Sequence, residues 1–172
     1  MFGYALYIIT FLIRTLIPVA VTLAFLLVEG LLTGFPGWYY LVPMATVPCV
    51  FFWSVYRPGF MPLIAAVFIG LAEGALLNTP LGLAVIPLVL TVAWVEISGR
   101  AVRQSGFSFQ WFTVTILIFV KILLYVAFEF ALGKDGAYVV WAYYVNKLVM
   151  GTVFYPITHL VLSWVNFAMG NP

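Results

Sequence analysis

Long apolar runs separated by short polar turns make up nearly the whole chain. A helix needs about 20 apolar residues to cross a hydrocarbon core of about 30 Å, and six stretches come near that length. They are 15–32, 38–56, 61–77, 81–97, 111–132 and a longer region, 137–167. The pattern predicts an all-α integral membrane protein of about six transmembrane helices, built as a single polytopic domain over residues 1–172.

The structure of the first and of the last apolar region is left open by this pattern. Residues 1–13 are apolar but too few to cross the membrane, so they either lie in the interface or extend the first helix. The region 137–167 is longer than one crossing requires. Its first part is rich in Tyr and Trp, so it either belongs to the last helix or lies along the outer interface.

Proline, glycine and charge mark the turns between these runs. The loop 33–37 contains Gly34, Pro36 and Gly37, which break a helix. Pro58 has no N–H to donate and disfavours the α region at Arg57, so the second helix should end there. Every loop is short, and we therefore expect no extramembrane domain that could hold an enzyme site.

Composition points to the same class of protein. The chain is 66% hydrophobic and 7% charged, whereas a soluble domain has about 25% charged residues. Aromatic residues make up 19% of the chain, as expected of belts at two membrane interfaces. The single cysteine, Cys49, excludes an internal disulfide. The net charge of +2 comes from scattered cations and predicts no nucleic-acid partner.

The cations of the short loops predict an orientation. In a model with six spans, Arg14, Arg57, Arg100 and Arg103 fall on one side of the membrane and Lys134 falls on the other. Positively charged loop residues favour the cytoplasmic side. We therefore expect both termini in the cytoplasm.

Two ionisable residues fall near the middle of the membrane. Glu73 lies roughly 18 Å and Lys121 roughly 15 Å from the cytoplasmic ends of their helices, at about 1.5 Å per residue. A charge at a helix centre costs about 2.5–3.5 kcal/mol on insertion scales, so the two are predicted to be partners. The pair is either a structural ion pair or part of a binding site. Glu29, Glu129 and Lys147 fall near outer helix ends, where interface positions are expected.

Small residues follow one face of the third helix. Ala66, Gly70 and Gly74 are four residues apart, so their side lets a neighbouring helix backbone come close. Glu73 lies beside them and is expected to face protein or water rather than lipid.

The other polar residues predict structural roles. Glu96 and Arg100 are four apart with the acid first, the better order for a helical ion pair. His159 is the only histidine, and Asp135 is the only aspartate. We find no phosphate-binding glycine loop, no metal-ligand spacing and no serine in a nucleophile motif. The chain is therefore predicted to have no catalytic, cofactor or metal site, although a transporter remains open.

The order of several short motifs resembles a known family. They are the aromatic helix end from Trp53 to Arg57-Pro58, then Gly70-Leu71-Ala72-Glu73, and then Pro80-Leu81-Gly82. In this order they resemble the rod shape-determining protein MreD family, with a weaker similarity at Tyr155-Pro156. The likeness covers about 40 residues well. It departs at Glu73, where the family usually has aspartate.

The resemblance implies a role in the cell-elongation (rod shape) machinery of a bacterium, in peptidoglycan synthesis. Members of the family are multi-pass proteins of the inner membrane that act with MreC and, more widely, with MreB, RodA and a class B penicillin-binding transpeptidase. On this basis the chain is expected to be a non-enzymatic scaffold in membrane lipid. The candidate partner-binding or structural residues are Arg57, Pro58, Ala66, Gly70, Glu73, Gly74, Pro80, Gly82 and Lys121.

A second hypothesis is the substrate-binding membrane subunit of a small-molecule, vitamin-type transporter. Such subunits of energy-coupling-factor transporters also have six helices, and MreD proteins resemble them in fold. They dock through small residues spaced Ala-x-x-x-Ala on helix 1, and this chain has Ala20 and Ala24 there. A closed, outward-facing pocket with convergent polar groups would favour transport, and a filled core with a grooved or flat lateral face would favour the scaffold.

Overall fold

A computed structural model describes residues 2–35, 37–38, 41–132 and 137–170, and all regular structure within these ranges is helical. The six helices are α1 (Phe2–Thr33), α2 (Thr46–Tyr56), α3 (Leu63–Leu76), α4 (Leu81–Gln104), α5 (Phe107–Ala131) and α6 (Ala137–Ala168). The all-α class and the number of helices predicted from the sequence are thus confirmed.

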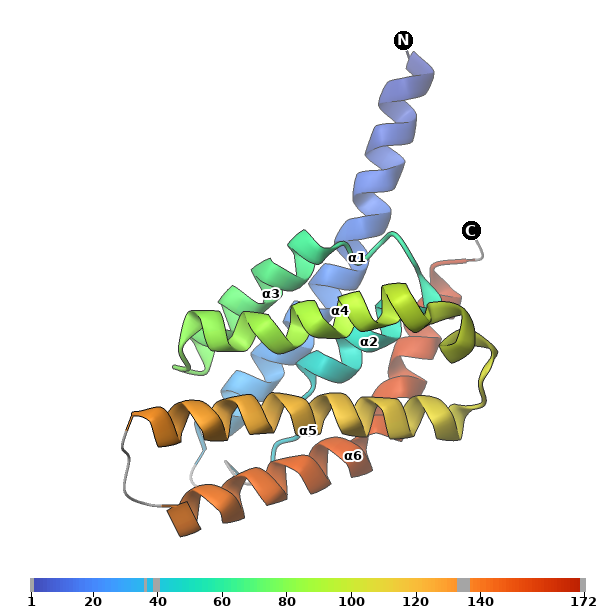
Figure 1. The fold of residues 1–172 in the computed structure, drawn as a ribbon. Helices are drawn as coiled ribbons and strands as arrows, with labels where there is room; N and C mark the ends of the chain where they lie inside the picture. The colour runs from blue at the N-terminus through green and yellow to red at the C-terminus, as the bar shows by residue number, and fades with distance from the viewer. Residues whose placement is uncertain (1, 36, 39–40, 133–136, 171–172) are drawn as a thin grey trace.

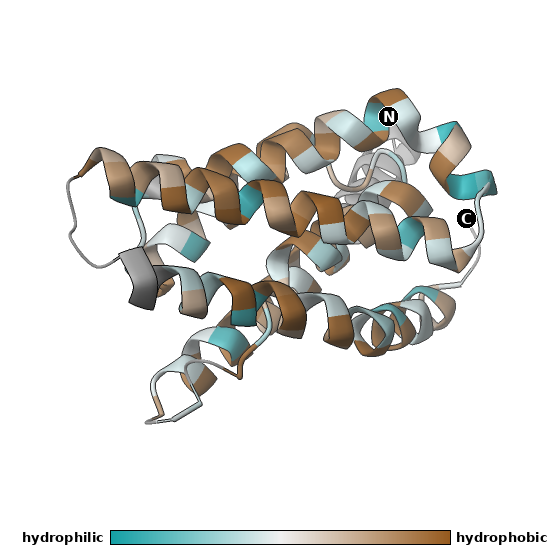
Figure 2. Cartoon of the chain, turned by 60° about the horizontal axis from the view of Figure 1, so that its bottom comes forward, coloured by the Kyte–Doolittle hydropathy of each residue, from teal (hydrophilic) through white to brown (hydrophobic). Residues whose placement is uncertain are grey.

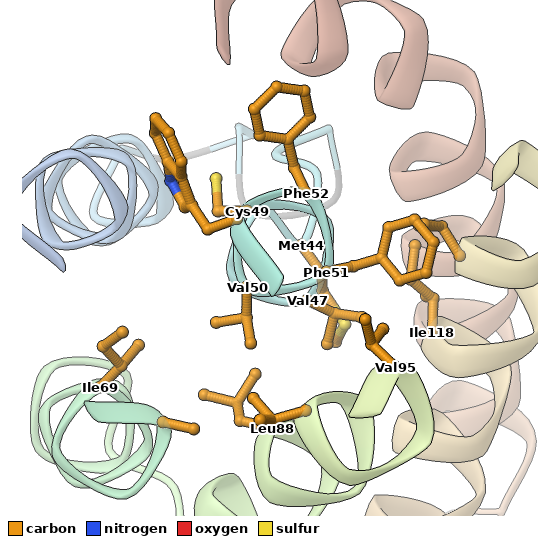
Figure 3. Packing of buried hydrophobic residues seen from close by; sticks show 14 of the residues in the cluster. Met44, Val47, Cys49, Val50, Phe51, Phe52, Ile69, Leu88, Val95 and Ile118 are labelled. Carbon is orange, nitrogen blue, oxygen red and sulfur yellow. The ribbon is translucent and has the colours of Figure 1, made fainter. Parts of the chain in front are cut away.

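Helix α2 lies at the centre of the bundle. It contacts α1, α4, α5 and α6, and every residue of the helix except Tyr56 is buried. Phe51, Val50 and Cys49 point in different directions from its axis, toward neighbouring helices (Figure 3). Around it, α3 lies along α4, α4 runs beside α5, and α6 lies along the other side of α5 (Figure 1).

Four helices are long and apolar enough to span a membrane among the described residues. Their apolar segments are Leu16–Thr33, Gly82–Gln104, Phe107–Ala131 and Trp141–Ala168. At 11 and 14 residues, α2 and α3 rise only about 16 and 21 Å, less than the hydrocarbon core. Of the six or so transmembrane helices expected, four are thus long and apolar enough to cross, and α2 and α3 are shorter apolar helices.

Helix α2 begins eight residues later than the sequence pattern predicted. A helix from Trp38 would carry both Pro43 and Pro48 in its interior, where each removes a hydrogen bond and clashes with the preceding turn. A start at Thr46 leaves Pro43 outside and puts Pro48 in the first turn, where the missing N–H has no helical partner to lose. Residues 42–45 are consequently non-helical although they are mostly buried.

The other helix boundaries lie closer to those predicted from the sequence. Helix α4 continues to Gln104 and α5 begins at Phe107, so most of the polar stretch 98–110 is helical and not a loop. Helix α1 is continuous from Phe2, and its N-terminal turns extend away from the other helices (Figure 1). Residues 2–13 therefore extend the first helix. The last region forms one helix of 32 residues with Pro156 inside.

The outward surface of the bundle is apolar. Hydrophobic residues dominate the long helices over most of their length (Figure 2), and large side chains such as Phe68, Ile97, Phe112 and Trp164 are exposed on several helices. In water such a surface would be an aggregation hazard. Together with the apolar spans it indicates a protein embedded in a membrane.

The loops fall at two ends of the bundle, which makes the predicted topology testable. Pro58 and Gly106 are exposed in the α2–α3 and α4–α5 turns, which lie at one end of the bundle (Figure 1), and Gly37 and Leu132 are exposed just after α1 and α5, whose last residues line the cavity toward the other. With the buried Cys49 replaced by alanine, a single cysteine at Gly37 or Leu132 is expected to react with a membrane-impermeant thiol reagent added to intact cells. Labelling of a cysteine at Pro58 or Gly106 under the same conditions would invert the predicted orientation. Lys134, on which the prediction also relied, lies outside the described residues.

Candidate functional site

The non-helical segment before α2 is held by two charged side chains from distant helices. The backbone N–H of Ala45 donates to Glu29 Oε2 of α1 at 3.1 Å. Lys147 Nζ of α6 donates to the carbonyl of Val42 at 2.7 Å. Non-helical backbone at membrane depth is tolerated only where such groups are satisfied by protein or water. Glu29 and Lys147 therefore stabilise the break that the prolines impose.

The predicted partnership of Glu73 and Lys121 is confirmed. Lys121 Nζ donates to Glu73 Oε1, and both side chains are almost fully buried. The same ammonium donates to Thr46 Oγ1 at 3.1 Å, in the first turn of α2. The ion pair thus joins α3 to α5 and also ties α5 to the start of the central helix.

These four residues form one charge cluster: Glu29, Glu73, Lys121 and Lys147. Glu29 lies close enough to interact electrostatically with the other three. Two acids and two bases leave the cluster formally neutral, and opposite charges are what make buried ions tolerable. The negative Glu29 also lies at the N-terminus of α2, where the helix dipole favours an anion.

Glu29 and Lys147 were expected near the outer interface, with pairing possible, and both make internal contacts. They are 4% and 2% exposed, respectively. The signal that could have placed them is the spacing of Pro43 and Pro48, because a break inside the membrane needs polar side chains around it. Glu129, expected at the interface too, is half-buried. The predicted pair of Glu96 and Arg100 does not form a salt bridge, and both are exposed.

A cavity of about 1100 Å³ opens beside the charge cluster. Its walls come from the end of α1, the turn between α3 and α4, the end of α5 and the first part of α6. Glu29, Glu73 and Lys147 line it, together with Glu129 and aromatic side chains. Tyr125 on the wall donates to Thr79 Oγ1 at 3.4 Å. This volume lies just above the usual range of about 300–1,000 Å³ for small-molecule sites.

The small face of α3 is internal. Ala66, Gly70 and Gly74 are all buried, whereas Ile64 and Phe68 on the same helix are exposed. A Cβ atom added at Gly70 would lie 2.6 Å from the Cα of Val85. Gly70 therefore allows the backbones of α3 and α4 to touch, as expected of closely packed membrane helices.

Arg57 closes the end of α6. Its Nε donates to Asn166 Oδ1 at 2.7 Å, and its Nη2 donates to the carbonyls of Asn166 and Gly170 at 3.2 and 2.5 Å. The last carbonyls of a helix lack helical partners, and a cation is favourable there. Pro58 is exposed in the following turn, where Gly59 has a φ of +92°.

Pro80 and Gly82 belong to the turn that starts α4. Asn78, at a φ of +52°, follows the end of α3, and the N–H of Thr79 donates to the carbonyl of Gly74 at 3.0 Å. This pattern is a Schellman-type helix end. Pro80 then precedes the first residue of α4, and Gly82 is exposed with open space around it. These residues shape the turn and lie at the cavity end of the bundle.

The polar contacts at the opposite end are structural. Tyr56 donates to Gln110 Oε1 at 3.0 Å and lies 3.2 Å from His159 Nε2. The His159 ring packs edge-on against Phe52 and Phe107. Among the described residues, no three His, Cys, Asp or Glu side chains lie close enough together to hold a metal ion. Comparison of the chain with models of protein families, with curated proteins and with solved structures found no match.

The contacts of Arg57 predict a local effect of its removal. Arg57→Gln should loosen the end of α6, because hydrogen bonds from a charged group contribute about 1.5–3 kcal/mol and three carbonyl-type acceptors lose their donor. Hydrogen exchange of the purified protein in detergent should then increase near residues 166–170, with little change in α5. Arg100→Gln, at an exposed arginine, is the matched control. Equal exchange at the α6 end in both variants would contradict the capping role.

Proposed function

We propose that this protein is a non-enzymatic component of the bacterial cell-elongation machinery, similar to MreD proteins. It would lie in the inner membrane with both termini in the cytoplasm. Its direct partner would be MreC, with MreB, RodA and a class B penicillin-binding transpeptidase in the wider complex. The protein would act by holding partners in membrane lipid, without catalysing a reaction itself.

One observation carries this proposal: residues in two motifs of the resemblance, the Arg57-Pro58 helix end and Gly70-Leu71-Ala72-Glu73, make contacts that join helices. Arg57 ties the end of α2 to α6, Gly70 brings α3 against α4, and Glu73 pairs with Lys121 of α5. A chance string of common dipeptides would have no reason to carry the main helix contacts. The motifs therefore support a shared architecture with the family that they resemble.

The distribution of polar residues agrees with a scaffold that meets its partners in lipid. The hydrogen bonds of the charge cluster are made within the protein, and the outward helix faces are apolar. Helices associate in lipid through close packing and a few hydrogen bonds, so such faces can hold a partner helix without any exposed charge.

The proposal is tested by replacement in a rod-shaped bacterium depleted of its own MreD. The chain, produced there together with the MreC of its own source, should restore rod shape and should co-purify MreC from detergent-solubilised membranes. Gly70→Leu, which should not fold, is the control for an inactive protein. Normal accumulation of the unaltered chain with round cells and no recovery of MreC would overturn the proposal.

The cavity supports the second candidate, the substrate-binding subunit of a transporter. The criterion stated from the sequence is a closed, outward-facing pocket with convergent polar groups, and this cavity supports its polar part, since Glu29, Glu73 and Lys147 line it. Ala20 and Ala24 are both exposed on α1, as docking to a coupling subunit would require. If the protein is a transport subunit, the double substitution Ala20→Leu with Ala24→Leu should abolish co-purification of an ATPase module from native membranes. If it is the scaffold of the first proposal, the same substitutions should leave co-purification of MreC unchanged.

A further inference from the structure

The cavity beside the charge cluster contains two carboxylate oxygens to which no described residue donates a hydrogen bond. Glu29 Oε2 accepts from Ala45, Glu73 Oε1 accepts from Lys121, and Lys147 donates to Val42. After these contacts, Glu73 Oε2 and Glu129 Oε2 are buried and have no hydrogen-bond partner among the described residues. Glu73 is only 2% exposed as a whole.

An unsatisfied carboxylate oxygen in such a place is unfavourable. Burying a charged acceptor without a donor has a large free-energy cost, far above that of a neutral group. Both glutamates line the cavity, and the last torsion of a glutamate side chain is broad. A small rotation therefore lets either oxygen meet a donor that enters the cavity.

The charge and the walls of the cavity select the kind of donor. Among the described residues, three glutamates and one lysine line the cavity, and counting Lys121, which pairs with Glu73, still leaves one more acid than base. Tyr125, Phe128, Tyr143 and Tyr144 form an aromatic wall. Aromatic faces attract cations, most strongly where water is excluded. Because no described group of side chains is arranged to hold a metal ion, an organic cation fits better than a bare one.

We propose that this cavity binds a molecule that carries an ammonium group on an apolar body. The ammonium donates to Glu73 and Glu129, and the apolar body lies against the aromatic wall. The inference does not depend on the proposed function, because a scaffold and a transport subunit could both use such a site. The ammonium can come from a soluble amine or from the headgroup of an aminophospholipid.

The soluble arm of the test compares three probes of similar shape on the full chain purified in detergent. Calorimetric titration should detect binding of 2-phenylethylamine, and should show binding at least tenfold weaker for 2-phenylethanol and 3-phenylpropionate, which lack the cation.

The lipid arm of the test uses native mass spectrometry of protein from nanodiscs that contain equal amounts of phosphatidylethanolamine and phosphatidylglycerol. Selective retention of phosphatidylethanolamine would identify the lipid as the source.

Variants separate binding in the cavity from binding elsewhere. Glu129→Gln keeps the shape and leaves the ion pair of Glu73 intact, so it should weaken amine binding about tenfold or more. Gly30→Phe should abolish it, because Gly30 lines the cavity and has open space around its Cβ position. Glu96→Gln, at an exposed glutamate on α4, is the matched control and should bind normally.

Each result of the binding experiments either supports or overturns the proposed ammonium site. Preference for the amine or for phosphatidylethanolamine, lost in Gly30→Phe and kept in Glu96→Gln, supports the site. Equal binding of amine, alcohol and carboxylate with no selective lipid would overturn it. Tighter binding of 3-phenylpropionate than of the amine would also overturn it, since that result would assign the site to Lys147.

Discussion

Replacing either Glu73 or Lys121 alone is expected to destabilise the protein more than replacing both. The two side chains are 2% and 1% exposed and share one ion pair. Removing one partner of a buried pair leaves the other charge uncompensated and costs about 3–5 kcal/mol in soluble proteins, whereas replacing the whole pair is far milder. The variants are Glu73→Gln, Lys121→Met and the double substitution.

The two single variants should not be equal. Lys121→Met removes the one hydrogen-bond donor that the described residues give the Glu73 carboxylate, and Glu29 adds like charge nearby. Glu73→Gln leaves Lys121 with its contact to Thr46 Oγ1 and with Glu29 as a remaining anion. We therefore expect Lys121→Met to be the more damaging change.

The free energy of unfolding in detergent micelles, followed by circular dichroism, gives the measurement, and the yield of monodisperse protein supports it. A non-additive cycle is the expected result. The control cycle uses Glu96→Gln and Arg100→Gln, which are exposed and form no salt bridge. That cycle should be additive within a few tenths of a kcal/mol. Additive losses at Glu73 and Lys121 as well would mean that the pair contributes nothing specific.

The pairing of Glu73 with Lys121 could be predicted because both lie at similar depth, and burial of either charge alone is too costly. The spacing of small residues likewise predicted that a backbone comes close to Gly70, but it left open whether that backbone belongs to this chain or to a partner. Both arguments use only the position of a residue along a helix. They succeed when the helix itself has been assigned correctly, as it was for α3 and α5.

The arrangement around α2 could not be predicted in this way. Hydropathy alone assigned one long helix from Trp38 to Tyr56, because residues 38–45 are as apolar as a span requires. The two prolines decide where the helix begins, and that shift exposes the Val42 carbonyl and the Ala45 amide to Lys147 and Glu29. The cavity depends on the same break, since Met44 lines it.

Gly70→Ala is expected to be strongly destabilising although it adds only one methyl group. The added Cβ would lie 2.6 Å from Val85 Cα and 2.9 Å from Val85 Cγ2. The nearest atom belongs to the backbone of α4, so a side-chain rotation cannot relieve the overlap. Overpacking of this kind typically costs about 1–3 kcal/mol, and Gly70→Leu should cost more.

Gly30→Ala is the matched control for this change. Gly30 also lies inside a helix, α1, but nothing is within 4 Å of its Cβ position. Alanine is favoured over glycine in a helix by about 0.5–1 kcal/mol, so this variant should be neutral or slightly stabilised. Thermal unfolding in detergent and the yield of folded protein should separate the two variants clearly.

A second-site change distinguishes contact through the backbone from contact through the side chain. Val85→Ala removes Cγ2 but leaves the Cα that lies nearest to the added methyl group. It should therefore fail to rescue Gly70→Ala, because the two helix axes still have to separate. Full rescue would show that α3 and α4 are held apart by the valine side chain. Gly70 would then only make room for that side chain, and the close approach of the backbones in lipid would not be what holds the two helices together.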